Sequence, residues 1–317
     1  MEKIKIKFID FWNGFLPNNN YFFNLLSEYF EVELSEEPDI LIYSCYGTGY
    51  LQYECIRIFY TAENVRPDFS GCDFAISFDF NKDHRHFRLP LYALYIDQFN
   101  SQSKLLATRS KEEALKIWRG KTKFCCMVVS NLKSKKRLNF FNKLSKYKRV
   151  DSGGKALNNL GSLVKDKMEF IKDYRFVISF ENSSYPGYTT EKILDSFVMD
   201  SIPLYWGNPL IHIDFNANCF LNLGNYRSEG KFIQKIIEID NDEELAIKMI
   251  MEPKFKDAEI PLDINRERLV AFFRRIILAK HFINPVGKGK MKYLHAFNLK
   301  KNHYFNRVKE QLNRNFR

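Results

Sequence analysis

The sequence predicts an α/β protein built from two Rossmann-like domains. Short apolar runs of strand character alternate along the chain with segments of helical spacing. Strands separated by helices of about 10 to 15 residues form parallel sheets, because each crossover must return over one face of the sheet. The 317 residues fit two such domains of ordinary size, and we expect a cleft between them.

The first predicted domain spans residues 1–119. In its opening strand, Ile4–Phe8, apolar residues alternate with lysine, which is the period of a half-buried strand. Helical spacing follows from Tyr21 to Phe30, and a polar, helix-forming stretch around Lys111–Arg119 ends the domain. The short buried strands expected between these two helices are Asp39–Tyr43, Ile56–Tyr60 and Phe74–Phe78.

The second predicted domain, residues 120–275, repeats this alternation. A strand at Phe124–Val129 leads into a helix from Lys136 to Tyr147 and then into a strand that ends at Asp151. The elements expected after it are helices at 165–174 and 190–199 and strands at 176–180 and 202–205.

Residues 276–317 form a basic tail, which is set apart by a break at Pro285-Val286-Gly287. It holds ten lysines and arginines against Glu310 alone, so most of the net charge of +11 lies there and the body is nearly neutral. This distribution argues against a nucleic-acid-binding surface and for local attachment to an anionic membrane surface. Apolar residues at roughly helical spacing predict an imperfect amphipathic helix: Tyr293, Phe297, Tyr304, Val308 and Leu312. A helix packed on the body and a disordered tail remain open alternatives.

The sequence predicts neither a membrane span nor a secretion signal. Its longest apolar candidate, Leu269–Ala279, is interrupted by Arg274 and Arg275, and charged residues separate the apolar ones at the N-terminus. The six cysteines lack zinc-type spacing, so we expect free thiols. We therefore expect a cytoplasmic protein that attaches peripherally to the inner face of the cell membrane.

The segment from Phe180 to Ile193 has the layout of a phosphate site. A buried strand ends at Phe180, a Pro-Gly turn follows, and a helix opens at Thr189 or Thr190 with a hydroxyl available as N-cap. Lys192 is unfavourable in a first helical turn unless an anion lies beside it. A diphosphate would satisfy both the lysine and the helix amides, while Glu191 could accept ribose hydroxyls. From spacing alone, a helix start with surface charges remains an alternative.

The chain resembles the α1,3/α1,4-fucosyltransferase family in several blocks, which follow one another in the family's order. The block with the signature of that family is Phe180–Lys192, continued at Ile202–Pro209 and Asp214–Asn216. Upstream blocks that resemble the family are Phe59–Phe69, Cys72–Asp79, Arg88–Tyr92, Val128–Asn131, Arg137 and Val150–Lys155. The resemblance covers residues 1 to about 280, which makes it far more specific than one short motif.

The resemblance implies a GT-B glycosyltransferase, with two Rossmann-like domains facing a cleft and a basic helical tail. GDP-fucose would bind in the C-terminal half and an oligosaccharide acceptor in the N-terminal half. The implied reaction moves L-fucose from GDP-β-L-fucose to a GlcNAc or Glc hydroxyl of an N-acetyllactosamine-type glycan, with inversion and in α1,3 linkage. Such an enzyme would serve protein or lipopolysaccharide glycosylation.

Inversion requires a base on the acceptor side and charge stabilisation on the diphosphate side. Glu63 matches the position of the family's proposed base; its alternative is a carboxylate that caps or pairs with Arg66. Lys192 and Arg137 are assigned to the diphosphate. For Arg137, which lies in a lysine-rich run, a solvated helix face is the alternative.

Further nucleotide contacts are carried over from the resemblance. Glu191 is the expected ribose ligand, with Asn182 and Tyr188 nearby; Asn182 could instead form a turn, and Tyr188 could be a core residue. Ser152 and Gly153 would let backbone amides approach the nucleotide, on the weak signal of a Gly-Gly turn after a strand.

We expect neither a metal nor another cofactor to be required. Asp240-Asn241-Asp242 has the spacing of a metal clamp, but the helical run behind it favours an N-cap with an acidic first turn. The alternatives to a fucosyltransferase are a GT-B transferase for another nucleotide sugar, a catalytically silent sugar-binding module, and a basic nucleic-acid-binding protein. The last is disfavoured because the aromatic residues lie mostly in the apolar body and not among the lysines of the tail.

Overall fold

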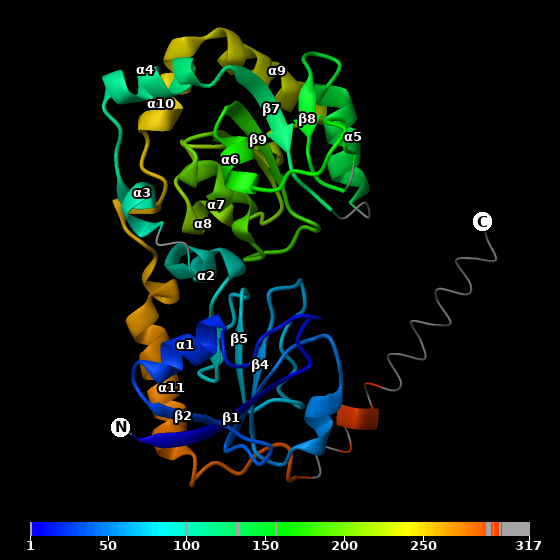
Figure 1. Cartoon of the computed structure of the whole chain (residues 1–317), viewed down its shortest axis with the longest axis vertical. Coiled ribbons are helices and arrows are strands. Elements are labelled where there is room, and N and C mark those ends of the chain that lie inside the picture. The colour runs from blue at the N-terminus through cyan, green and yellow to red at the C-terminus, as the bar shows by residue number, and fades with distance from the viewer. Residues whose placement is uncertain are drawn as a thin grey trace, which may run out of the picture. The chain divides into compact units, whose positions relative to one another are not determined.

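The computed structural model describes residues 2–98, 101–130, 134–155, 157–289, 293, 295–297 and 299. These residues form two compact units. Unit 1 contains the described residues up to Ser77, Asn81–Leu89 and those from Asn265 onward. Unit 2 contains Phe78–Phe80 and the described residues of Pro90–Ile264. Figure 1 labels several elements of each unit.

Unit 1 is built on a parallel sheet with the strand order β2-β1-β3-β4-β5-β6. In β3 and β4 every residue is buried, as expected for parallel strands covered on both faces. The strands predicted at the positions of β1, β3, β4 and β5 are confirmed, whereas β2 and β6 were not predicted. The strands are β1 (Lys3–Ile9), β2 (Glu31–Leu34), β3 (Ile40–Tyr43), β4 (Ile56–Tyr60), β5 (Phe74–Ser77) and β6 (His86–Arg88).

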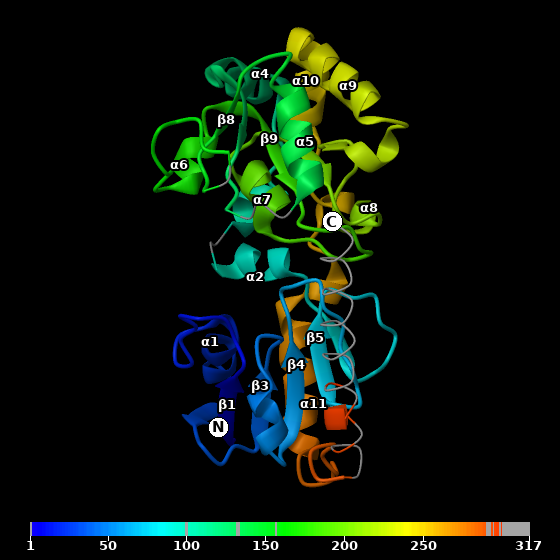
Figure 2. The same ribbon diagram turned by 90° about the vertical axis from the view of Figure 1, so that its right-hand side faces the viewer.

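The helices of unit 1 come from both ends of the chain. The N-terminal α1 (Tyr21–Ser27) is capped by the Asn20 side chain, and a short 3₁₀ turn, η1 (Gly49–Gln52), follows β3. The last long helix, α11 (Arg266–Ala279), lies alongside the same sheet (Figure 2). Its Phe272 ring lies 6.0 Å from Phe74 of β5, measured between ring centroids, and Phe273 packs edge-on against Phe22 of α1.

Unit 2 repeats this architecture with the strand order β11-β10-β9-β7-β8, again all parallel. Its strands are β7 (Lys123–Met127), β8 (Val150–Ser152), β9 (Tyr174–Phe180), β10 (Ile202–Trp206) and β11 (Leu221–Asn222). The α-helices are α2 (Leu91–Gln98), α3 (Gln102–Leu106), α4 (Lys111–Gly120), α5 (Lys135–Leu144), α6 (Lys167–Ile171), α7 (Glu191–Val198), α8 (Ile211–Asp214), α9 (Glu229–Asn241) and α10 (Glu243–Met251). Short 3₁₀ turns are η2 (Leu223–Asn225), η3 (Lys256–Ala258) and η4 (Leu262–Ile264). The predicted α/β class with two Rossmann-like domains is confirmed.

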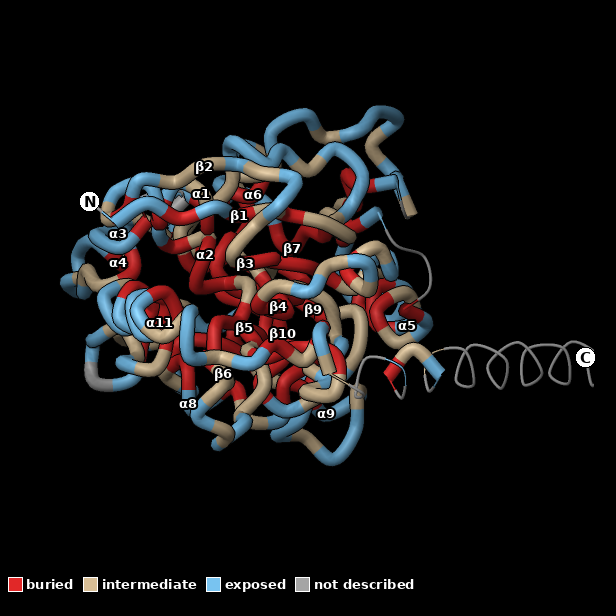
Figure 3. The backbone as a smooth tube through the Cα atoms, turned by 90° about the horizontal axis from the view of Figure 1, so that it is seen from below, coloured by how far each residue is buried: buried red, intermediate tan, exposed pale blue. Residues whose placement is uncertain are grey.

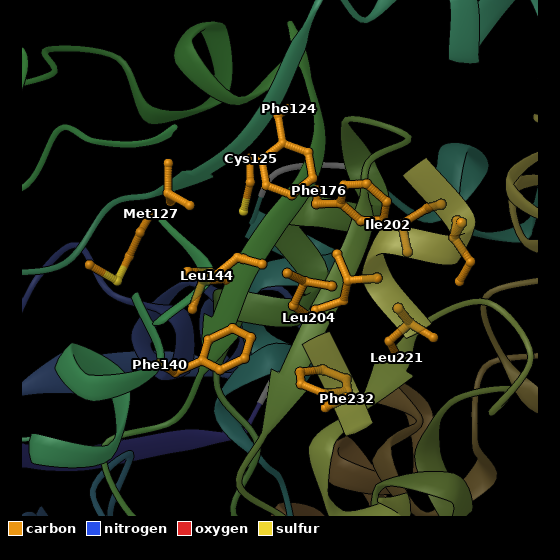
Figure 4. Close-up of a cluster of buried hydrophobic side chains, with 14 of the residues drawn as sticks. Phe124, Cys125, Met127, Phe140, Leu144, Phe176, Ile202, Leu204, Leu221 and Phe232 are labelled. Carbon is orange, nitrogen blue, oxygen red and sulfur yellow. The ribbon is translucent and has the colours of Figure 1, made fainter. Parts of the chain in front are cut away.

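The core of unit 2 is a layer of apolar side chains between its sheet and the helices α5 and α9 (Figure 4). Phe140 of α5 stacks on Phe180 of β9 with ring centroids 4.7 Å apart, and it also contacts Phe232 of α9, with ring centroids 5.4 Å apart. Each fully buried ring of this kind contributes about 1.5–3 kcal/mol relative to an exposed one. In both units the buried residues are concentrated in the strands (Figure 3). The loops at the strand ends are therefore anchored to a well-packed sheet.

The unit boundaries differ from the predicted boundaries after residues 119 and 275. The segment with α2, α3 and α4 belongs to unit 2, because α4 packs on α10 while α2 and α3 pack on α7. Helix α11 returns to unit 1, although most of it was assigned to the second domain. The chain therefore passes from unit 1 to unit 2 and returns to unit 1 with α11. The order of helices and strands along the sequence does not show this return.

The basic tail begins on unit 1. His295 is 2% exposed, and its Nε2 and Nδ1 atoms lie 2.6 Å from Tyr50 Oη and 2.8 Å from Ser70 Oγ. Tyr293 and Phe297 are exposed, and the other apolar positions of the predicted amphipathic helix (Tyr304, Val308, Leu312) lie outside the described residues. Among the helices that are described, none is long and apolar enough to cross a membrane.

We expect Phe273→Ala to lower the free energy of unfolding by about 3–5 kcal/mol, because the ring is 1% exposed in the contact between α11 and α1. Urea denaturation followed by circular dichroism measures the change. Leu278→Ala removes a 63% exposed side chain from the same helix and should stay within about 0.5 kcal/mol of the unmodified protein. A similar small effect of Phe273→Ala would mean that α11 does not anchor unit 1.

Candidate active site

Each sheet has one topological switch point, the place where the order of its strands reverses. In unit 1 this point lies between β1 and β3, and in unit 2 between β7 and β9. Ligands of open parallel sheets bind outside the carboxyl ends of the strands at such a point. In unit 2 the loop after β9 contains the motif that the sequence singled out.

A carboxylate that sequence reasoning missed organises this motif. Glu181, directly after β9, is 0% exposed and accepts hydrogen bonds from the Thr190 backbone N–H and the Thr190 hydroxyl, both at 2.7 Å. It also pairs with Lys192, with an Nζ–Oε2 distance of 3.2 Å. Thr190 is the N-cap residue of α7, as predicted, but its side chain makes no capping hydrogen bond. The anion beside Lys192 is therefore a protein carboxylate, which corrects the argument that Lys192 needs a diphosphate to be stable.

Lys192 and Glu191 occupy the first turn of α7 and remain partly accessible, with 17% and 22% of their side chains exposed. Burial works against the charged form of Lys192, but Glu181 and Glu191 together raise its pKa above the ordinary value. Burial likewise opposes ionisation of Glu191, but Lys192 and Lys167 bring its pKa below the ordinary value. Both groups are therefore charged at neutral pH.

Arg137 lies within the same cluster. Its guanidinium donates through Nε and Nη2 to the Phe180 carbonyl oxygen, at 3.2 and 2.7 Å, and through Nη2 to Asn182 Oδ1 at 2.8 Å. With 1% exposure it points inward, so the alternative of a solvated helix face is wrong. Burial lowers the pKa of this guanidinium, while Glu181 opposes that change. Arg137 thus spans the switch point from α5 to β9 and fixes the orientation of Asn182.

The loop between β9 and α7 is held in place by buried contacts. Asn208 accepts a hydrogen bond from the Gly187 N–H at 2.8 Å and donates to the Thr189 hydroxyl at 3.1 Å. Gly187 has φ +84°, and a Cβ there would lie 2.4 Å from the Phe78 carbonyl oxygen, so this turn requires glycine. Tyr188 is 2% exposed and packs edge-on against Phe78, which places its ring in the core.

Ser152 and Gly153 do not offer their amides to a ligand. The Ser152 N–H donates to Asn159 Oδ1 at 2.8 Å, and the Gly153 N–H donates to the Met127 carbonyl at 3.1 Å. A Cβ on Gly153 would lie 2.2 Å from Val164, so this glycine is needed for packing inside the unit. The expected approach of these two amides to a nucleotide is therefore wrong.

A cavity of about 280 Å³ opens beside Glu191. It is lined by Tyr95, Lys167, Met168, Glu191 and Asp195, all of unit 2. Lys167 and Asp195 form an ion pair, and burial raises the pKa of Asp195 in spite of it. A concave site with several hydrogen-bonding groups suits a polar ligand such as a sugar or a nucleoside.

The candidate base Glu63 belongs to unit 1 and follows β4. It is half-buried, and its Oε1 accepts a hydrogen bond from the Tyr46 hydroxyl at 3.1 Å. Its backbone N–H donates to Thr61 Oγ1 at 3.0 Å. Arg66, the partner considered for Glu63, donates to Asn64 Oδ1 at 3.1 Å. The backbone of Glu63 is thus fixed at the carboxyl end of the sheet.

The Asp240–Asp242 segment is structural. Asp242 caps α10 by accepting from the Glu244 and Leu245 N–H groups, which confirms the predicted N-cap. Asp240 is 8% exposed and pairs with Lys148 at 2.9 Å. Among the described residues, no group of three or more His, Cys, Asp or Glu side chains could hold a metal ion.

Two crystal structures define the class of this protein. A structure of α1,3-fucosyltransferase with GDP matches 87% of this chain and 91% of its own, at 26% identity and a TM-score of 0.74. Another, of α1,3-fucosyltransferase with GDP-fucose, matches 92% of both chains at 25% identity and a TM-score of 0.73. The fold is that of the GT-B glycosyltransferases.

Family models agree with this class. The model of the α-(1,3)-fucosyltransferase FucT N-terminal domain matches residues 6–95, and that of the glycosyltransferase family 10 (fucosyltransferase) C-terminal region matches residues 118–249. The chain belongs to the fucosyltransferase family.

Similar curated proteins carry related names. α-(1,3)-Fucosyltransferase FucT of Helicobacter pylori is 28% identical over 299 residues, which are 82% of this chain and 62% of that protein. The human 4-galactosyl-N-acetylglucosaminide 3-α-L-fucosyltransferase 9 is 31% identical over 132 residues, 40% of this chain and 36% of that protein. The chain thus spans about three-fifths of the bacterial relative and a smaller share of the human one.

We expect Glu181→Ala to lower the free energy of unfolding by about 3–5 kcal/mol, because it leaves a buried amide without an acceptor and Lys192 without its buried partner. Chemical denaturation measures the loss. Glu112→Ala, at an exposed position of α4, is the control and should change stability by no more than about 0.5 kcal/mol. Equal effects of the two substitutions would remove Glu181 from its structural role.

Proposed function

We propose that this protein is an α1,3-fucosyltransferase, which moves L-fucose from GDP-β-L-fucose to a GlcNAc or Glc hydroxyl of an N-acetyllactosamine-type glycan with inversion. The observation that carries the proposal is the cluster of Lys192, Arg137, Glu181 and Glu191 at the switch point of unit 2, in which the two cations are held in place beside a cavity. Fucosyltransferase structures with GDP and with GDP-fucose match nearly the whole chain, which supports the same donor.

Unit 2 would bind the donor through charge and hydrogen bonding. The Lys192 ammonium would pair with the diphosphate directly. The guanidinium of Arg137 is buried, so it would stabilise the diphosphate by its positive charge and not by direct contact. Asn182, oriented by Arg137, would donate its amide to a phosphate oxygen. Glu191, beside the cavity, would accept the ribose hydroxyls. Tyr188 would hold this loop in place through the packing of its buried ring on Phe78.

Unit 1 would bind the acceptor, and Glu63 would be its general base. As the acceptor oxygen forms its bond to C1 of fucose, the Glu63 carboxylate takes the hydroxyl proton. The C1–O bond to the diphosphate breaks on the opposite face, and its electron pair leaves with GDP. Attack and departure on opposite faces invert the configuration at C1, and Lys192 stabilises the charge that develops on the leaving group.

The acceptor proposed here is an N-acetyllactosamine-type glycan, as part of protein or lipopolysaccharide glycosylation. The names of the human and Helicobacter pylori relatives support a 3-linked fucose on N-acetylglucosamine. The test is incubation of the full chain with GDP-fucose and a panel of oligosaccharides, followed by linkage and anomeric analysis of the product. An α1,3-fucosylated product is expected; transfer from another nucleotide sugar, or none, would contradict the proposal.

Lys192→Ala should weaken GDP binding at least about 10-fold as well as slowing turnover, since the diphosphate is anionic both in the bound donor and in the transition state. Titration calorimetry with GDP measures the affinity. Lys231→Ala, which removes an exposed lysine of α9, should leave it unchanged. A folded Lys192→Ala protein with normal GDP affinity would exclude Lys192 from the phosphate site.

Transfer should continue in excess EDTA, because Lys192, Arg137 and the N-terminus of α7 supply the positive charge that a divalent cation supplies in other transferases. Initial rates with and without chelator give the comparison. Loss of activity that manganese restores would show that a metal takes part.

We further propose that the protein is cytoplasmic and attaches peripherally to anionic membranes through its basic tail. The exposed Tyr293 and Phe297 rings, which neighbour the lysines of the tail, support an interfacial role. Vesicles with anionic lipid should sediment the full chain, and salt should weaken the binding. Deletion of residues 300–317 removes six basic residues but keeps His295 and Leu299, which pack on unit 1, and it should sharply weaken sedimentation; unchanged sedimentation would contradict this attachment.

A further inference from the structure

Two exposed aromatic rings mark the switch point of unit 1. Trp12 lies in the loop after β1 and is 44% exposed. Tyr46 lies in the loop after β3 and is 50% exposed. Their ring centroids are 6.4 Å apart and the ring planes meet at 75°. Large exposed rings at the carboxyl ends of the two strands that flank a switch point lie where parallel sheets bind ligands.

The Trp12 ring rests on a packed aromatic base. It contacts Phe15 edge-on at 5.2 Å and Phe11 at 5.7 Å, and these two phenylalanines stack on each other at 4.0 Å. The turn that allows this is closed by a hydrogen bond from the Phe15 N–H to the Trp12 carbonyl, with Gly14 at φ +86°. The indole is therefore supported from below while its exposed part is available to a ligand.

The loop that carries Tyr46 is pinned by Asp10. The Asp10 carbonyl accepts from the Tyr46 N–H at 3.1 Å, and its carboxylate accepts from the N–H groups of Gly49 and Tyr50 at 3.0 and 2.9 Å. A Cβ on Gly47 would lie 2.2 Å from Asp10 Oδ1, so the loop packs tightly over this side chain. Asp10 itself adopts φ 60°, a strained conformation of the kind found at functional sites.

Tyr46 joins the aromatic pair to Glu63. Its hydroxyl donates to Glu63 Oε1 at 3.1 Å, and burial together with the Glu63 charge raises the pKa of Tyr46, so the hydroxyl remains a donor. A sugar hydroxyl within hydrogen-bond reach of Glu63 brings its pyranose ring next to Tyr46 and, through it, to Trp12. The C–H faces of a pyranose pack on aromatic rings, which is why such rings line sugar sites.

We propose that Trp12 and Tyr46 form an acceptor subsite, in which the two rings hold the sugar that carries the attacked hydroxyl and Tyr46 positions the Glu63 carboxylate. The ligand class is a pyranoside with a free equatorial hydroxyl next to an apolar ring face. This assignment rests on the proposed function, in which Glu63 is the base.

Trp12→Ala tests the stacking role. It should raise the KM for N-acetyllactosamine at least 10-fold while the KM for GDP-fucose stays unchanged and the protein stays folded, because the residue lies in a partly exposed loop of unit 1. Trp12→Phe should recover part of the loss. Phe282→Ala removes a 90% exposed ring from another part of unit 1 and should change neither KM. An unchanged acceptor KM in Trp12→Ala would overturn the proposal.

Tyr46→Phe separates stacking from positioning. The ring stays, so the acceptor KM should change less than threefold. The carboxylate of Glu63 loses its donor, so kcat should fall while both KM values hold. Cys45→Ser, a change at the residue next to Tyr46, should leave kcat in place. Tyr46→Ala should raise the acceptor KM as well. An unchanged kcat in Tyr46→Phe would exclude the positioning role.

Sugar binding can be measured without transfer. Of the three tryptophans, Trp118 is 2% exposed and Trp206 is only partly accessible, so added N-acetyllactosamine should alter fluorescence mainly through Trp12. Loss of this response in Trp12→Phe would support the subsite even if the chain transferred no fucose. Transfer by the unmodified protein with full activity in Trp12→Ala would refute the subsite and leave the proposed function intact.

Discussion

The buried Glu181 carboxylate ties the end of β9 to the start of α7 in unit 2. It accepts hydrogen bonds from the Thr190 backbone N–H and the Thr190 hydroxyl, and it pairs with the Lys192 ammonium. Gly207 must be glycine for this carboxylate to fit, since a Cβ there would lie 2.4 Å from Glu181 Cγ. The charge of Lys192 is therefore fixed in place before any ligand binds. A preorganised charge of this kind stabilises a leaving group without reorganisation during the reaction.

The two units share the order of their parallel strands around the switch point but differ in the side chains that lie there. In unit 2 the switch point collects charged groups, namely Arg137, Glu181 and Lys192, which suit a diphosphate. In unit 1 the switch point presents Trp12 and Tyr46 near one carboxylate, which suits a neutral sugar with a hydroxyl to be deprotonated. Fold alone does not separate a donor half from an acceptor half, so the proposed roles of the two units rest on the side chains at the strand ends.

Much of this could be predicted from the sequence, because local signals determine it. Buried strands such as Ile56–Tyr60 and the N-cap at Asp242 follow from patterns of a few residues. Glu181 could not be predicted as the partner of Lys192, because the contact depends on how the loop between them folds. The roles of Ser152 and Gly153 were wrong for the same reason, since their N–H groups bond to residues placed by tertiary packing. The return of α11 to unit 1 depends on the Phe272 and Phe273 contacts, which no local pattern encodes.

Titration of the full chain with GDP and with UDP tests the donor site proposed for unit 2. Calorimetry at neutral pH and moderate salt gives both dissociation constants and the number of sites. One saturable GDP site per chain is expected, and UDP should bind at least about 10-fold more weakly, a difference of about 1.4 kcal/mol, because the similar fucosyltransferase structures hold GDP and GDP-fucose. Equal binding of the two nucleotides, or no binding of GDP, would overturn the proposed donor.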